Sequence, residues 1–327
     1  MSRVSTRAGG RSLAGIALVL VAFAAFPWVF AGKLNFGFGL VLFAALATSW
    51  DLLGGWAGQL SLGHTAFVGL GAYVSTLLWT RAGIPLVWGL PLAMLSGVAV
   101  ALVWGAITFR LRGAYFSLSS IAVAEVLRIL ANNWVSVTGG PEGLSLNDLP
   151  PLFGFDLYDR RVEYYLALVL LGAALLTSWR VGSSRAGFYL EAIREDQDSS
   201  MAMGVNPLKM KLAAFCMSAA LSTAGGCLYG IYLAFFEPHG VFSLDLSIQL
   251  VLMAIVGGMG TVFGPTLGAV VLLGFQEAFR STFQQRSLLI YGIVIVIIVR
   301  YAPDGLLGRL RLLSRRMPWA SRLPSGP

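Results

Sequence analysis

Charged residues are scarce in this chain: Asp, Glu, Lys and Arg together make up 12% of its 327 residues. A soluble globular domain carries about 25%, and the hydrophobic share here is 57%. Apolar runs of roughly 18 residues or more, the length that spans a bilayer, recur along the chain. The composition excludes a soluble protein and predicts an all-α, polytopic transmembrane helical bundle. The apolar runs are continuous and do not alternate with polar residues, which argues against a transmembrane β-barrel.

Cysteine and histidine are also rare, with two of each. Cys216 and Cys227 fall on one expected helix about 16 Å apart, which is too far for a disulfide. His64 and His239 are distant in sequence, so no cluster of metal ligands is expected. Ser61 lies three positions before His64, but the serine and histidine of an intramembrane hydrolase usually come from different segments. We therefore expect no metal site, no cofactor and no enzymatic activity.

A phosphate-binding loop is missing as well. The pattern G-x-x-x-x-G-K-[ST] does not occur, because Gly32-Lys33 is followed by Leu34 and lacks the upstream glycine. The chain is therefore not expected to bind ATP in that way, and any ATP hydrolysis would come from a separate subunit. The net charge of +8 does not indicate nucleic-acid binding, because the basic residues lie at the ends of apolar runs, where they set membrane orientation.

The apolar runs predict about ten membrane spans. The expected spans cover residues 12–31, 34–54, 59–79, 84–108, 114–132, 162–179, 210–234, 246–262, 265–280 and 287–303. Most Lys and Arg residues fall on one side when the spans alternate from a cytoplasmic N-terminus, so both termini are expected to be cytoplasmic. The chain then divides into a cytoplasmic segment 1–11, one transmembrane domain 12–308 and a basic cytoplasmic tail 309–327, which is expected to be disordered. The first run begins like a signal peptide but continues through Phe30, which favours an uncleaved span.

The segment GQLSLGHTAF (58–67) places polar groups inside a hydrophobic region. Gln59, Ser61, His64 and Thr65 are expected to face protein or a water-filled path, since an unpaired polar group in hydrocarbon is costly. Two interpretations remain open. The segment forms part of a translocation path at a helix break that moves, or it bonds neighbouring helices and holds the bundle together. The glycine-rich third and eighth expected spans are candidates for broken or re-entrant helices.

Charged side chains also fall within expected spans. Glu125 and Arg128 are three positions apart on one helix, which predicts an internal ion pair. They are also candidates for the translocation path, where they could meet the charges of a zwitterionic substrate. Asp51 lies near a span end and is expected to reach water.

Residues 183–207 form the most charged stretch of the chain. Ser183 or Ser184 is expected to cap a helix, and Gly204 is expected to end it in the left-handed conformation. Asn206 and Pro207 predict the cap and the first position of the next helix. One polar face is expected at positions spaced i, i+3, i+4 and i+7, namely Glu191, Arg194, Glu195 and Asp198. A capped helix with a charged face and a glycine turn suits docking to a soluble partner.

The stretch EAIREDQDSSMAMGV (191–205) resembles the coupling-loop motif of ATP-binding-cassette (ABC) importer permeases. Glu191, Ala192 and Gly204 match its marker positions, and Ile193 stands where the family often has a second alanine. Other stretches resemble the LivM-type branched-chain amino acid permease family, namely LLGGWAGQLSLGHTAFVGLGAYVS, RGAYFSLSSIAVAEVLRILANNW with TGGPEGL, LVLMAIVGGMGTVFGPTLGA and APDGLLG. The resemblance covers about residues 34–309, which is nearly the whole chain.

This resemblance implies a multi-pass permease subunit in the inner (cytoplasmic) membrane, embedded in the lipid bilayer. Its implied partners are a second, LivH-like permease subunit, two cytoplasmic ABC ATPases and a periplasmic or extracellular substrate-binding protein. The ATPases would act on the 183–207 loop and drive import by alternating access. The implied coupling residues are Glu191, Ala192, Arg194, Glu195, Asp198 and Gly204.

Branched-chain amino acids are the implied substrates, and urea, short amides or another small acid remain alternatives. An ion-coupled secondary transporter is a further alternative, because such a protein needs buried carboxylates to carry protons or sodium. Its candidate carboxylates are Asp51, Glu125 and Glu277.

Overall fold

The computed structural model describes residues 3–111, 113–146, 157, 159–283, 292, 300 and 305–309. Helices account for most of this part of the chain, and one short antiparallel strand pair accompanies them. The long helices are α1 (Arg3–Ala24), α3 (Leu34–Gly54), α4 (Thr65–Ala82), α5 (Leu86–Thr108), α6 (Ala114–Asn133), α8 (Arg160–Ser183), α11 (Pro207–Leu233), α13 (Leu244–Gly257) and α14 (Gly264–Phe283). The shorter elements are α2 (Phe26–Val29), α7 (Val135–Thr138), α9 (Arg185–Glu195), α10 (Gln197–Ala202), α12 (Pro238–Val241), β1 (Leu144–Ser145) and β2 (Phe235–Phe236), with 3-10 turns at Ala31–Lys33 and Gly140–Glu142.

Seven helical stretches in the described part of the chain are long and apolar enough to cross a membrane. They are Ser12–Val29, Ala31–Gly54, Leu86–Thr108, Ala114–Asn133, Arg160–Ser183, Pro207–Leu233 and Pro238–Gly257. The protein is therefore a polytopic, all-α helical bundle. The expected number of about ten spans is not confirmed, and the span expected at 287–303 lies outside the described residues apart from two isolated positions, as does the tail beyond residue 309.

Two of the expected spans have the wrong limits. The third, expected at 59–79, begins as a helix only at Thr65, and the eighth, expected at 246–262, ends as a helix at Gly257. Both limits fall at glycine-rich stretches, where the helix gives way to irregular backbone. Irregular backbone therefore occupies one end of each of these two expected spans.

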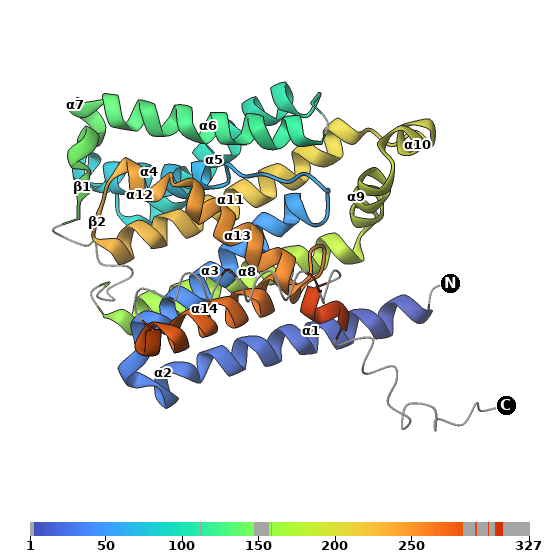
Figure 1. The fold of residues 1–327 in the computed structure, drawn as a ribbon, viewed down its shortest axis with the longest axis horizontal. Coiled ribbons are helices and arrows are strands. Elements are labelled where there is room, and N and C mark those ends of the chain that lie inside the picture. Colours follow the sequence, from blue (N-terminus) through green and yellow to red (C-terminus); the bar gives the residue numbers. More distant parts are fainter. Residues whose placement is uncertain are drawn as a thin grey trace.

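Helix α3 forms the centre of the bundle. In the Ala31–Gly54 span 83% of the residues are buried, against 11% in the Ser12–Val29 span at the periphery. Helices α8, α11, α13 and α14 all pack against α3, and Figure 1 shows α1 lying beyond α14 at the edge of the bundle. Because α3 is apolar around its whole circumference, it can be surrounded by protein on every side.

Close contact between α4 and α11 depends on small residues. A Cβ atom added at Gly71 would lie 2.0 Å from the carbonyl oxygen of Thr223, and one at Gly226 would lie 2.1 Å from that of Val68. Each glycine thus touches the backbone of the other helix, as small residues do where helices associate in membranes.

The two ends of the bundle carry different structures. Helices α9 and α10 lie at one end together with the start of α1, whereas α7, α12 and the strands lie at the opposite end (Figure 1). At that opposite end β1 pairs with β2, with Leu144 opposite Phe236. This pairing ties the segment that follows α7 to the connection between α11 and α12.

Candidate functional site

The first break in the helical structure separates α3 from α4 and comprises residues 55–64. Gly58 adopts a left-handed backbone with φ of 68°, which favours glycine. Because α4 begins at Thr65, the polar residues Gln59, Ser61 and His64 lie in this irregular segment, which we call the first break. In a membrane protein such backbone must find hydrogen-bond partners within the protein or in water.

Side chains from neighbouring helices supply those partners. The Ser120 hydroxyl on α6 accepts hydrogen bonds from the amides of Leu62 (2.8 Å) and Gly63 (3.2 Å). The Ser117 hydroxyl donates to the carbonyl of Leu60 (2.7 Å). On the other side, the indole of Trp50 on α3 donates to the carbonyl of Ser61 (2.7 Å). The first break is therefore held between α3 and α6.

His64 is fully buried and joins three segments. Its Nε2 lies 2.8 Å from the hydroxyl of Ser218 on α11, and its Nδ1 lies 3.4 Å from the hydroxyl of Ser61. The Ser218 hydroxyl donates its proton to the carbonyl of Ser49 on α3 (2.5 Å). It must then accept from His64, so the imidazole carries a proton on Nε2.

The remaining path candidates differ in their surroundings. Thr65 is buried and bonds Ser247 on α13 through its amide (3.2 Å) and its hydroxyl (3.0 Å). Gln59 is only partly buried, and its amide donates to the carbonyl of Gly58 at 3.5 Å. Ser61, His64 and Thr65 therefore face protein, as expected of polar groups in a bundle, whereas Gln59 lies at the edge of this cluster.

A second break, residues 258–263, separates α13 from α14 and lies against the first. Its Gly260 has a left-handed φ of 67°, and its amide donates to both carboxylate oxygens of Asp51 at 3.0 and 3.1 Å. Asp51 is fully buried. The expectation that Asp51 reaches water is therefore wrong. The amide of Gly260 is not used within a helix, so it can donate to the Asp51 carboxylate in place of water.

Glu125 and Arg128 do not join this cluster. They form the expected ion pair on α6, with Arg128 Nε 2.9 Å from Glu125 Oε2, and Arg128 Nη1 lies 3.5 Å from Nδ1 of His239. Together with Glu237 and Asp245 they line an open cleft of about 450 Å³ at the end of the bundle where α12 lies. This cleft, which we call the polar cleft, presents charges of both signs.

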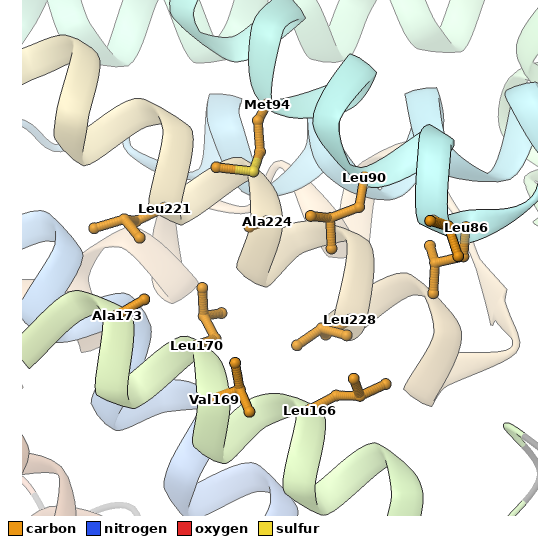
Figure 2. Close-up of a pocket in the computed structure, with 11 residues that line it drawn as sticks. Leu86, Leu90, Met94, Leu166, Val169, Leu170, Ala173, Leu221, Ala224 and Leu228 are labelled. Atoms are coloured by element: carbon orange, nitrogen blue, oxygen red, sulfur yellow. The ribbon is translucent and has the colours of Figure 1, made fainter. Parts of the chain in front are cut away.

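A second hollow is apolar throughout. It has a volume of about 360 Å³ and lies between α5, α8 and α11. Figure 2 shows Leu90 and Met94 of α5 facing Leu170 of α8 across it, with Leu221 and Leu228 of α11 beside them. Among the described residues, no charged or hydrogen-bonding side chain lines this groove. It offers no partner for an ammonium or carboxylate group, whose burial without one is costly.

The charged loop has the expected boundaries but not the expected single face. Ser184 caps α9, accepting from the amide of Gly187 (3.4 Å), and Asn206 caps α11, accepting from the amide of Lys209 (3.1 Å). Gly204 has the expected left-handed φ of 85°. However, the helix is interrupted at Asp196, whose extended backbone caps α10. Glu191, Arg194 and Glu195 lie on α9, whereas Asp198 lies on α10, so the four do not share one helical face.

Burial divides these coupling candidates. Glu191, Glu195, Asp198 and Gly204 are exposed, and Ala192 is half-buried. Arg194 is the exception in its contacts, because its guanidinium reaches inward and its Nη1 donates to the carbonyl of Gly55 in the first break (2.8 Å). The loop thus presents exposed residues to the surface and also contacts the buried cluster through Arg194.

Several residues of the cluster were not identified from sequence. Ser120 and Ser218 bind the first break, and Ser247 binds Thr65 at the start of α4. Each of these serines comes from a different helix far along the chain. A serine in an apolar helix most often bonds its own helix backbone, so nothing in the local pattern marked these three. Asp51 was noted as a charge, but its partner Gly260 could be found only from the fold.

Comparisons with known proteins agree with one another. The family described as the branched-chain amino acid transport system permease component matches residues 34–299. The chain is 31% identical to the high-affinity branched-chain amino acid transport system permease protein LivM of Salmonella typhimurium, over 90% of this chain and 75% of that protein. It is 30% identical to the Escherichia coli protein of the same name, with the same coverage. The ribose import permease protein RbsC of Escherichia coli is 23% identical, over 61% of this chain and 65% of that protein. No solved structure matches the chain significantly.

Proposed function

Because this chain belongs to the family of branched-chain amino acid transport system permease components, we propose that it carries branched-chain amino acids across the inner membrane by alternating access. It is a transmembrane permease component, and the energy comes from separate ATPase subunits. The observation that carries the mechanism is the meeting of two helix breaks at the buried Asp51, next to the surface helix α9. Discontinuous helices are common at the substrate sites of transporters.

The translocation path in this proposal follows the first break. Ser61, His64 and Thr65 are bonded to protein in the structure, which corresponds to a closed path. Opening would exchange these contacts for water and for the polar ends of the substrate. Gln59 borders the path, and Glu125 and Arg128 stand at its entrance in the polar cleft, where charges of both signs suit a zwitterion.

The partner surface in this proposal is the exposed side of α9 and α10. Glu191, Ala192, Glu195, Asp198 and Gly204 would contact two cytoplasmic ABC ATPases. A second, LivH-like permease subunit and a periplasmic or extracellular binding protein complete the assembly. Both termini would be cytoplasmic with about ten spans, so the chain divides into segment 1–11, the permease domain 12–308 and the tail 309–327.

Reconstitution tests this function. We expect liposomes that contain this chain, the second permease subunit, both ATPases and the binding protein to import radiolabelled leucine, isoleucine and valine when ATP is enclosed. Omitting ATP is the control and should abolish uptake. Competition by urea or a short amide, without competition by leucine, would assign a different substrate. Uphill uptake by the chain alone, without ATPases, would show an ion-coupled transporter instead.

A further inference from the structure

Arg194 differs from the other charged residues of α9 because it points into the protein. Its guanidinium bonds the Gly55 carbonyl at 2.8 Å, and 36% of its side chain is exposed, against 74% for Glu195. Leu190 and Ile193 are buried on the same side of α9 and anchor the helix to the bundle. The Arg194 side chain thus extends a face of α9 that is already fixed to the membrane domain.

The same side chain touches both helix breaks. A Cβ atom added at Gly58 would lie 2.5 Å from Cγ of Arg194, so the aliphatic part of the arginine packs directly on the first break. A Cβ atom added at Gly260 would lie 2.9 Å from Nη1, so the guanidinium also lies against the second break. Only glycine leaves room for the arginine at either position.

Asp51 completes the connection on the side of α3. Its carboxylate holds the Gly260 amide, and it is attracted electrostatically by Arg194. Gly55 lies between these groups, because a Cβ atom there would meet both Asp51 Oδ1 and the Gly260 amide. A continuous set of contacts therefore runs from α9 through Arg194 to both breaks and to the central helix.

We propose that Arg194 is a positioning residue that transmits the movement of α9 to both helix breaks, and that it is not a contact for the ATPase. This inference rests on the proposed function, in which ATPases act on α9. A rigid, hydrogen-bonded side chain can convey a displacement of α9 to Gly55 and Gly260, whereas an exposed side chain on the same helix cannot.

The first test uses the reconstituted assembly with Arg194→Gln, and Arg180→Gln as the control. Arg180 is an exposed arginine at the end of α8, so its substitution makes the same change in charge. We expect R194Q to retain the ATPases on purification and to hydrolyse ATP, but to import leucine about tenfold more slowly, because one charge-assisted hydrogen bond is lost. Arg194→Lys should recover part of the uptake, since an ammonium can still donate to the Gly55 carbonyl.

Two results would overturn this inference. Uptake by R194Q equal to that by R180Q would show that the contact transmits nothing. Loss of ATPase co-purification in step with uptake would make Arg194 a partner contact.

A second measurement does not depend on transport. Hydrogen–deuterium exchange on the purified chain should show faster exchange of backbone amides at 55–64 and 258–263 in R194Q than in R180Q. Equal exchange at both breaks would refute the connection, even if the wild-type assembly failed to transport and the proposed function fell.

Discussion

At the scale of single residues, His64 shows how the bundle satisfies polar groups away from water. Its two ring nitrogens join Ser61 in the first break to Ser218 on α11, and Ser218 continues to the α3 backbone. The direction of the hydrogen bond between His64 and Ser218 follows from the single proton of the Ser218 hydroxyl. His64 thus connects the first break to α11 and, through Ser218, to α3.

Replacement of His64 by leucine should destabilise the protein by about 1–3 kcal/mol, because the buried hydroxyls of Ser61 and Ser218 would each lose a hydrogen-bond partner. The measurement is the thermal unfolding midpoint of the purified protein in detergent. His239→Leu is the matched control, since His239 is exposed in the polar cleft and should change the midpoint little. Equal midpoints for both variants would mean that the His64 contacts do not stabilise the fold.

Residue types in the sequence predicted that Gln59, Ser61, His64 and Thr65 face protein or a water-filled path, and the last three bond protein in the structure. The partners themselves could not be predicted, because hydrogen bonds between residues more than a hundred positions apart leave no local pattern. The error over Asp51 has the same origin. A carboxylate near a span end reaches water unless a remote backbone amide replaces it, and here the Gly260 amide does so.

At the scale of helices, backbone contact through glycine determines how closely α4 and α11 approach. Gly71 and Gly226 each meet a carbonyl of the other helix. Glycines four positions apart, such as Gly226 and Gly230, favour close helix approach, but their spacing does not indicate which helix occupies that face.

Gly226→Ala should lower stability by about 1–3 kcal/mol, because the new methyl group cannot fit against the Val68 carbonyl and the helices must separate. Gly89→Ala on α5 is the control: a Cβ atom there meets nothing within 4 Å. That change should be neutral or stabilising, since alanine has a higher helix propensity than glycine. Thermal unfolding in detergent measures both, and similar shifts of the same sign would contradict the assigned contact.

Helix limits were predictable only where ordinary capping chemistry applies. Ser184, Gly204 and Asn206 were identified correctly from their neighbours, because caps and left-handed turns are local. The interruption at Asp196 was missed, since charges spaced i, i+3, i+4 and i+7 fit one continuous helix equally well. Its side chain accepts from the amides of Asp198 and Ser199, and this competing cap divides the helix in two.

At the scale of the whole molecule, the ends of the bundle have distinct characters. The charged loop and the start of α1 share one end, and the polar cleft occupies the other (Figure 1). Long apolar helices were predictable from composition because bilayer thickness fixes their length. The count of spans was not, because glycine-rich segments such as residues 55–64 and 258–263 interrupt hydrophobic regions without being helical.

Labelling with a membrane-impermeant maleimide should establish the orientation. In a background with Cys216 and Cys227 replaced by alanine, a cysteine at Ser199 on α10 should react only when the cytoplasmic side is accessible. A cysteine at Gly240, near the polar cleft, should react in intact cells after the outer barrier is permeabilised. Both positions are exposed. The reverse pattern would invert the topology and remove the ATPases from reach of α9.

The enclosure of α3 has a consequence for assembly. Only 22% of the Ala114–Asn133 span and 28% of the Leu86–Thr108 span are buried, so the rim helices α5 and α6 retain free faces, while α3 does not. A second subunit or the surrounding lipid can therefore contact α5 and α6 but not α3. In the proposed function, a solute path beside α3 would therefore lie inside one polypeptide, and not between two subunits.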